Sequence, residues 1–108
     1  MNTAKLAAAA VFAATISMGA SNALADNTVI QQDRTFRPGD ITIPAGSSLT
    51  IKNQDEFIHQ VYVDSPGFNY DSEEKQPGED LHIAFPTAGT FPVRCHIHPK
   101  MLLTVHVK

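Results

Sequence analysis

The sequence holds a single cysteine, Cys95, so the chain cannot close an internal disulfide. It has no cluster of basic residues, and a formal net charge of −3 argues against nucleic acid as a partner. Beyond the first segment, no stretch sustains the apolar period of a helix. These absences exclude a disulfide-stapled domain, a nucleic-acid-binding domain and a helical bundle.

Residues 1–25 have the composition of a secretory signal peptide. One basic residue, Lys5, precedes an apolar stretch, and Ala23-Leu24-Ala25 provides a small-x-small cleavage site. The apolar stretch is shorter than the roughly 20 residues that a spanning helix needs, so a retained membrane anchor is the weaker interpretation. The sequence has neither a twin arginine nor a cysteine after the cleavage site, which argues against Tat export and lipoprotein anchoring. We therefore expect an exported, soluble, periplasmic protein that begins at Asp26 and is not inserted in a membrane.

Residues 26–108 are expected to form one small domain. A domain of this size buries only about 60% of its unfolded surface, so we expect its stability to be marginal. In an oxidising compartment an exposed thiol is a liability, which favours a Cys95 that is buried or bound to metal. A metal ion bound to the folded state would also add stability.

Short apolar alternations, separated by Gly, Pro, Asp and Asn, dominate the sequence after residue 26. This pattern predicts an all-β sandwich. The polar and acidic segment 65–80 has neither strand nor helix periodicity, and we expect it to be a long surface loop. The predicted strands are Thr28–Gln31, Asp40–Ile43, Ser48–Asn53, Ile58–Asp64, Leu81–Phe85, Thr90–Cys95 and Leu102–Val107.

Cys95, His98 and Met101 stand three residues apart, directly after a predicted strand. A thiolate, an imidazole and a thioether together suit copper, whereas zinc rarely takes a thioether. His59, from a separate predicted strand, supplies a second imidazole. Two histidines and one cysteine with a weak axial methionine are typical of a blue-copper electron-transfer site. We predict one type 1 copper ion per chain, bound by His59, Cys95, His98 and Met101.

Strand alternation separates these residues from the other histidines. His59, Cys95 and Met101 share their parity with the apolar residues of their strands, which places them on core-facing sides. His98 is placed by its spacing in the loop alone. The opposite parity predicts that three further histidines face solvent: His82, His96 and His106.

Three of the four proposed ligands have a simpler interpretation when each is taken alone. Met101 could be a core methionine, Cys95 a small buried hydrophobic residue, and His59 a half-buried histidine bonded to backbone. Their joint occurrence at inward positions, beside a histidine at loop spacing in an exported all-β domain, favours the copper site.

Two further metal sites are less favoured. The segment Cys-His-Ile-His is similar to the copper-binding segment of multicopper oxidases, in which histidines on both sides of the cysteine reach a second copper cluster. Here Arg94 occupies the preceding position and the additional His-x-His pairs are absent, which favours a surface or hydrogen-bonding role for His96. The acidic run of Asp71, Glu73 and Glu74 lacks the ligand spacing and turn glycine of a calcium loop, so a solvated face is favoured.

Several segments carry a resemblance to a known family. Phe36-x-Pro38, Ile41-Thr-Ile-Pro-Ala-Gly46 and Leu49-Thr-Ile-Lys-Asn53 resemble its opening strands, and Ala88-Gly-Thr-Phe-Pro-Val-Arg-Cys95 resembles the strand that delivers the thiolate. The family is the cupredoxins of the amicyanin and plastocyanin type, and the short Cys-x-x-His-x-x-Met loop is closest to amicyanin. The resemblance covers essentially the whole of residues 26–108. It implies a small Greek-key β-sandwich of the cupredoxin type in which His59, Cys95 and His98 hold copper, Met101 is axial, and the protein carries single electrons.

The sequence departs from the family pattern at two positions. Family members usually place Asn after the first histidine ligand and Ser or Thr after the cysteine, a pair that links the two ligand segments. Here these positions hold Gln60 and His96. The stretch between His59 and Cys95 is also short for the family.

We expect a monomer that transfers electrons between redox protein partners, such as a dehydrogenase, a cytochrome or an oxidase, and that is not an enzyme. Ile97, Pro99 and Phe57 would border His98 with an apolar patch suited to brief docking. The alternative is a periplasmic copper carrier, or chaperone, that binds cuprous ion for delivery, although a buried ligand set releases metal slowly. A small oxidase or reductase would need an open second metal position or a substrate pocket, and the sequence offers ligands for neither.

Overall fold

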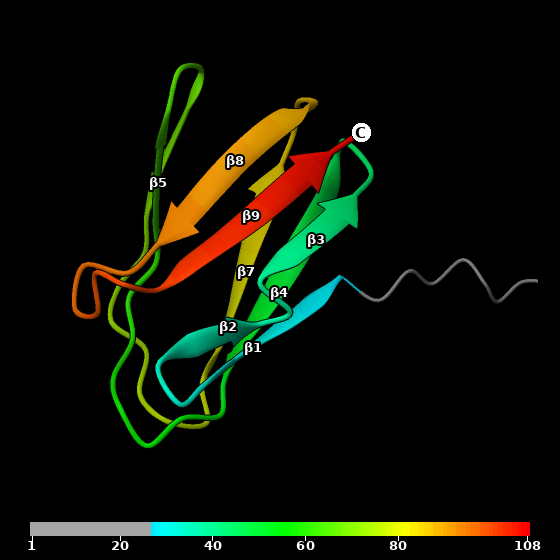
Figure 1. Cartoon of the computed structure of the whole chain (residues 1–108). Coiled ribbons are helices and arrows are strands. Elements are labelled where there is room, and N and C mark those ends of the chain that lie inside the picture. The colour runs from blue at the N-terminus through cyan, green and yellow to red at the C-terminus, as the bar shows by residue number, and fades with distance from the viewer. Residues whose placement is uncertain (1–26) are drawn as a thin grey trace, which may run out of the picture.

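The computed structural model describes residues 27–108, so the predicted signal peptide lies outside the described residues. Nine strands form two sheets that pack into a sandwich (Figure 1). One sheet has four strands in the order β2-β1-β4-β7, and the other has five in the order β3-β9-β8-β5-β6. The strands are β1 (Thr28–Gln32), β2 (Thr35–Arg37), β3 (Asp40–Ile43), β4 (Ser47–Asn53), β5 (Tyr62–Ser65), β6 (Phe68–Asp71), β7 (Asp80–Phe85), β8 (Gly89–Arg94) and β9 (Leu102–Val107).

The core is built by strand alternation, which confirms the predicted all-β sandwich. In β9, Leu103, Val105 and Val107 are buried, while Thr104 and His106 between them are half-buried. β8 follows the same rule, with Phe91 and Val93 facing inward. Burying one such side chain stabilises the fold by about 1.5 to 3 kcal/mol. Inward residues of both sheets therefore form one continuous hydrophobic core.

The short strand β2 is missed by the sequence pattern because its turn residues are unusual. Gln32 pairs with Thr35, so Asp33 and Arg34 form a two-residue hairpin turn, and both have a φ of 55°. Such turns normally carry Asn-Gly or Asp-Gly, because positive φ is costly for residues with larger side chains. The sequence Asp-Arg therefore gives little signal for a hairpin.

The prediction of a long surface loop over residues 65–80 is wrong at its start. Phe68–Asp71 forms β6, which pairs antiparallel with β5 through contacts such as Val63 opposite Tyr70. Phe68 and Tyr70 are partly buried against the core, and the Phe68 ring lies 5.1 Å from that of Phe85, centroid to centroid. The flanking Gly, Pro and acidic residues hide this short alternation in the sequence.

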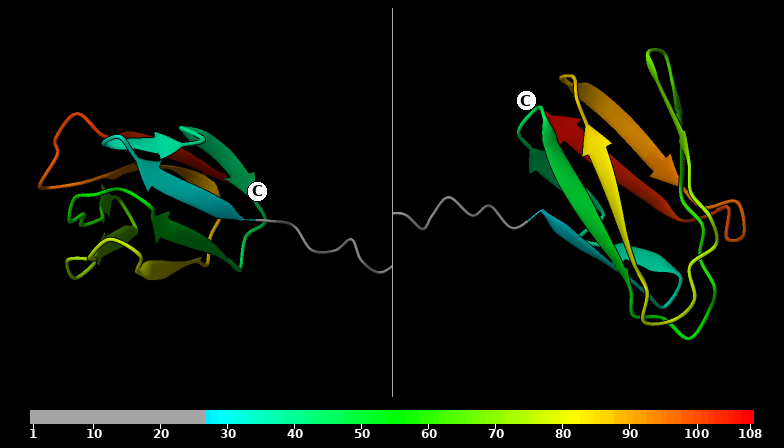
Figure 2. Two further views of the ribbon diagram at one scale, coloured as in Figure 1. Left: turned by 90° about the horizontal axis from the view of Figure 1, so that it is seen from below. Right: turned by 180° about the vertical axis from the view of Figure 1, so that it is seen from behind.

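The topology brings four connections to one end of the sandwich. These are the β1–β2 turn, the segment between β4 and β5, the segment between β6 and β7, and the loop between β8 and β9. In both views of Figure 2, the β8–β9 loop lies at the end opposite the C-terminus. Among residues 27–108, no helix has the length and apolar character required to cross a bilayer.

Candidate metal centre

Pairing of β8 with β9 fixes the two ends of the loop that carries Cys95, His98 and Met101. Arg94, the last residue of β8, lies opposite Leu102, the first residue of β9, so residues 95–101 form a closed connection. The Met101 N–H donates to the His98 carbonyl at 3.0 Å, which turns the loop back toward the sandwich. The thiol and the thioether are consequently buried, and His98 remains partly exposed.

His59 reaches the same place from a segment that is not a regular strand. The sequence predicts a strand from Ile58, but β5 begins at Tyr62, and this prediction is wrong at its start. His59 instead makes an isolated bridge with Lys75, in which each backbone N–H donates to the other residue's carbonyl, at 3.0 and 2.7 Å. The bridge holds His59 fully buried, with an exposed fraction of 0%.

Three donor atoms converge at this end of the sandwich. Nδ1 of His59 lies 4.0 Å from Sγ of Cys95, and Nδ1 of His98 lies 3.9 Å from the same sulfur. The two Nδ1 atoms are 3.2 Å apart. Within residues 27–108, this is the one group of three or more His, Cys, Asp or Glu residues whose ligand atoms cluster in this way. The structure thus brings together residues that the sequence separates by up to 39 positions.

The triangle of donor atoms has the dimensions of a metal site. With bonds of about 2.0 Å to nitrogen and 2.3 Å to thiolate sulfur, donors in a trigonal arrangement lie about 3.5 to 3.7 Å from one another. The distances in the structure, 3.2 to 4.0 Å, span this range. A thiolate with two imidazoles, and a buried thioether at the end of the same loop, is the donor chemistry that selects copper. The residues present therefore fit a copper ion.

The remaining histidines point away from this triangle. His82 is exposed and its Nδ1 lies 3.0 Å from the Thr50 hydroxyl. His106 is partly buried on the outer face of β9, where its Nε2 lies 3.0 Å from Oδ2 of Asp40. The predicted outward parity of both strands is confirmed.

The model of the cupredoxin-like domain family matches residues 5–105 of the chain. The chain belongs to the cupredoxin-like family. Copper is the metal that members of this family bind, in agreement with the donor set found in the structure.

The chain is similar in sequence to two relatives and in fold to one solved structure. Methylamine utilization protein MauL of Methylophilus methylotrophus is 29% identical over 89 residues, covering 80% of this chain and 51% of MauL. The chloroplastic plastocyanin of Physcomitrium patens is 32% identical over 72 residues, covering 58% of this chain and 43% of the plastocyanin. The chain thus spans about half the length of these two relatives. Amicyanin from Paracoccus versutus shares the fold, with a TM-score of 0.70 at 23% identity, covering 75% of this chain and 79% of amicyanin.

Gln60 links the two segments that carry the three converging donor atoms. Its Oε1 accepts a hydrogen bond from the His96 N–H at 3.2 Å, and its backbone N–H points at Sγ of Cys95, 3.5 Å away. Its Nε2 donates to the carbonyls of Val61 and Ser72, and also to Asp71. The longer glutamine side chain therefore connects the segments at the position where the family usually has asparagine.

The burial of Gln60 is not predicted by strand alternation. Both His59 and Gln60 are buried, as is Val61, so the segment before β5 has no outward face. Only the departure from the family pattern at this position pointed to Gln60.

His96 lies on the outer side of the same link. Its side chain is 58% exposed, and its ring stacks on Tyr62 with centroids 3.8 Å apart and planes 7° apart. Its Nε2 lies 3.9 Å from an oxygen of Asp71. This agrees with the predicted surface position.

Asp55 is a buried residue at the site that sequence reasoning missed. Its Oδ2 lies 3.0 Å from Nε2 of His59, on the ring edge opposite the donor triangle. Burial alone raises the pKa of Asp55, but hydrogen bonds from the N–H groups of Arg34 and Glu56 and from His59 outweigh it, and the pKa lies below its usual value. The carboxylate is therefore charged at neutral pH. In the sequence, Asp55 is distinguished only as an acidic residue four positions before His59, and acidic residues are common in turns.

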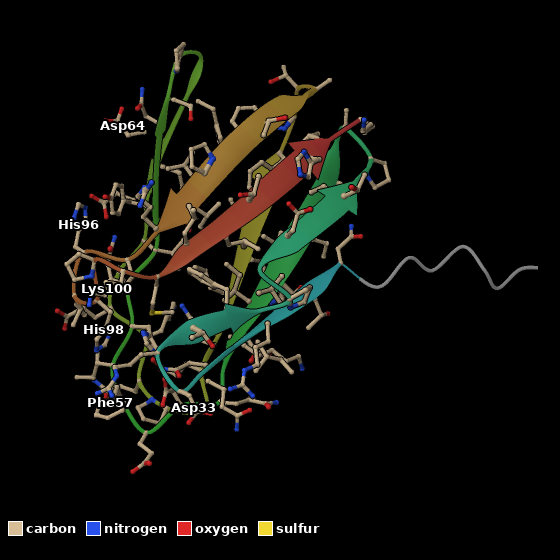
Figure 3. All side chains as sticks on the ribbon, in the orientation of Figure 1. Asp33, Phe57, Asp64, His96, His98 and Lys100 are labelled. Carbon is tan, nitrogen blue, oxygen red and sulfur yellow. The ribbon has the colours of Figure 1, made fainter. Side chains whose placement is uncertain are left out.

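His98 occupies the outer corner of the site. Burial, together with the neighbouring His59 and the positive charge of Arg34, lowers the pKa of His98, so the ring is neutral and able to bind metal at neutral pH. The Phe57 ring packs edge-on against His98 at 5.9 Å, and the Arg34 guanidinium lies 4.8 Å from the Phe57 centroid. Phe57 and Ile97 are 40% and 41% exposed, which makes this corner apolar. Figure 3 shows His98, Phe57 and Lys100 at one end of the sandwich.

Proposed function

We propose that this cupredoxin is a type 1 copper protein that carries single electrons between redox proteins, with His59, Cys95 and His98 as copper ligands and Met101 as the weak axial ligand. The observation that carries the proposal is the set of three donor atoms held 3.2 to 4.0 Å apart by two segments distant in the sequence. Copper would supply the one-electron redox couple at this position.

The surroundings of the donor triangle suit rapid electron exchange. Cys95 and His59 are buried and tied to the sandwich through Gln60 and the bridge with Lys75. Ligands that are held in this way move little when the charge of the site changes. A site that rearranges little exchanges electrons with a small barrier, because the protein dipoles are already oriented.

The partly exposed edge of His98 is the proposed route for electrons. A groove of about 590 Å³ lies beside it, lined in part by Ile97, Pro99 and Arg34. Ile97, Pro99 and Phe57 form a small apolar surface around the only proposed ligand that approaches solvent, and the Arg34 guanidinium lies at its edge. Such a surface suits brief docking of a redox protein, such as a dehydrogenase, a cytochrome or an oxidase.

We also propose that residues 1–25 are a signal peptide removed on export, and that residues 26–108 act as a monomer in the periplasm. The composition of the leader supports export. A copper carrier is less well supported, since ligands at least nine-tenths buried, such as His59 and Cys95, oppose release of the metal. An enzymatic role is also less well supported, because the described residues hold no second cluster of metal-binding side chains.

The visible spectrum of the purified, copper-loaded and oxidised protein tests the proposal. We expect an intense blue thiolate-to-copper absorption, lost in Cys95→Ala because no other residue supplies a thiolate. His82→Ala is the matched control, since this exposed histidine should leave the spectrum unchanged. A Cys95→Ala variant that stays blue would contradict the assignment. A colourless wild-type protein that hands cuprous ion to a chelator within seconds would favour the carrier.

A further inference from the structure

His59 has a different partner on each edge of its ring. Nδ1 faces Cys95 and His98, whereas Nε2 faces Oδ2 of Asp55 at 3.0 Å. A neutral imidazole carries one N–H, and a ring that gives its lone pair to a metal through Nδ1 must carry the proton on Nε2. Nε2–H then donates to the carboxylate. Asp55 therefore selects the tautomer that leaves Nδ1 free for metal.

The Asp55 carboxylate is itself fixed in place. Oδ2 also accepts the Arg34 N–H at 2.7 Å, and Oδ1 accepts the Glu56 N–H at 2.8 Å. The backbone N–H of Asp55 donates to Oδ1 of Asn53 at 2.9 Å, and the Asn53 amide in turn donates to two backbone carbonyls. Asp55 is only 7% exposed. The carboxylate is thus a buried, charged acceptor whose direction is set by backbone groups on both sides.

A charged acceptor on His59 acts on the two oxidation states unequally. A carboxylate that accepts the ring N–H makes the imidazole a stronger electron donor. Its negative charge, buried beside the ring, also attracts a divalent ion more strongly than a monovalent one. Both effects favour the cupric form.

We propose that Asp55 is a positioning residue for His59 that biases the metal centre toward the cupric state and so lowers its reduction potential. The inference rests on the proposed function, and it assigns to one carboxylate a role that a neutral acceptor could not fill. Asp55 has a competing structural role, because its bond to the Arg34 N–H also holds the β1–β2 turn against the segment before His59.

The chain offers a matched control for this carboxylate. Asp40 and His106 form a second Asp–His pair with the same separation, 3.0 Å between Oδ2 and Nε2, on the outer face of the five-stranded sheet. Asp40→Asn removes the same unit of charge and the same kind of hydrogen bond without contact with a proposed ligand. The shift in reduction potential caused by Asp40→Asn therefore measures the effect of a change in net charge alone.

The test compares the wild-type protein, Asp55→Asn and Asp40→Asn, all loaded with copper. We expect Asp55→Asn to lose at least about tenfold more cupric than cuprous affinity, measured by competition with chelators for each ion. That ratio corresponds to a rise in reduction potential of about 59 mV, measured by redox titration. Asp40→Asn should stay within twofold of wild type. If Asp55→Asn also stays within twofold, while its apo form unfolds more easily, Asp55 is a turn brace and the inference is overturned.

A second measurement covers the case in which Asp55→Asn fails to fold or to load. In the reduced wild-type protein, ¹H–¹⁵N spectra of the histidine rings should place a proton on Nε2 of His59, shifted downfield and slow to exchange with solvent. A proton on Nδ1, or one that exchanges within the dead time, would overturn the inference. A wild-type protein that is not blue would instead contradict the proposed function, so the two failures are distinguishable.

Discussion

Single residues set the properties of the metal centre in ways that their burial alone does not reveal. Met101 is only 2% exposed, as a core methionine would be, yet it stands at the end of the loop that carries two of the other proposed ligands. A packing role and a coordinating role of Met101 predict different effects of its substitution, because only a residue that coordinates the metal changes its reduction potential directly.

Met101→Gln is expected to keep the blue colour and to lower the reduction potential. Replacing the soft thioether with an oxygen donor favours the cupric state, and we expect a shift of at least the roughly 59 mV that corresponds to a tenfold change in the affinity ratio. Redox titration of the copper-loaded variant measures it. Met101→Leu is the control that keeps apolar volume without a donor atom, and its potential should rise. Unchanged potentials in both variants would leave Met101 with a packing role alone.

The sequence predicts the donor set better than the residues that support it. Cys95 and His98 are recognisable because spacing in one loop places them together. The parity that predicts an inward His59 assumes a strand from Ile58, whereas β5 begins at Tyr62 and the bridge with Lys75 buries His59. Asp55 and Gln60 carry no such signal, since an acid in a turn and a glutamine beside a strand are usually solvated. Their burial follows from contacts with segments distant in the sequence, including the Arg34 N–H and the Ser72 carbonyl.

At the scale of elements, the Gln60 side chain joins the segment before β5 to the loop after β8 and to the chain after β6. It replaces direct strand pairing at this point, because β5 and β8 share only one paired position, Tyr62 opposite Arg94. The two ligand-bearing segments therefore depend on this one buried amide for much of their alignment.

Gln60→Ala is expected to lower the free energy of unfolding of the apo protein by about 1 to 3 kcal/mol, because the partly buried His96 N–H and the buried Val61 carbonyl lose their partner. Urea denaturation of the metal-free protein measures the change. Gln54→Ala, at an exposed position on the same segment, should change it by no more than about 0.5 kcal/mol. Equal effects of the two substitutions would show that the link is dispensable.

Elements were predictable from sequence where alternation is long and uninterrupted. β9 has the predicted bounds because Leu103, Val105 and Val107 alternate without a break. β6 is short, and β2 follows a turn of non-glycine residues at positive φ. The sequence of neither strand can therefore be distinguished from that of the adjoining loops. The strand predicted from Ile58 begins four residues later because cross-chain bonding at His59, not parity, determines that segment.

At the scale of the whole molecule, a domain of this size has little stability to spare, and a metal bound only by the folded state adds to it by mass action. Copper at about a thousand times its dissociation constant would contribute about 4 kcal/mol. The free energy of unfolding should therefore be larger for the copper-loaded form than for the apo form.

We expect copper to raise the midpoint of thermal unfolding by at least about 15 °C, since each kcal/mol shifts a domain of this size by about 4 to 8 °C. Scanning calorimetry of the apo and copper-loaded wild-type protein measures the difference, and Cys95→Ala serves as the control that should show none of it. A loaded protein that melts with the apo form would mean that the metal binds the unfolded chain as well as the folded one.

The closed pairing of Arg94 with Leu102 has a consequence for how such a molecule can change over generations. The sandwich fixes the two ends of the connection between β8 and β9, and between the buried Cys95 and Met101 it constrains the exposed residues of the loop little. Three of the four proposed ligands are encoded in that one short, exchangeable stretch, whereas His59 is embedded among buried polar groups that tolerate little substitution. Substitutions confined to this one loop can therefore change the reduction potential of the metal site, while the sandwich and His59 stay unchanged.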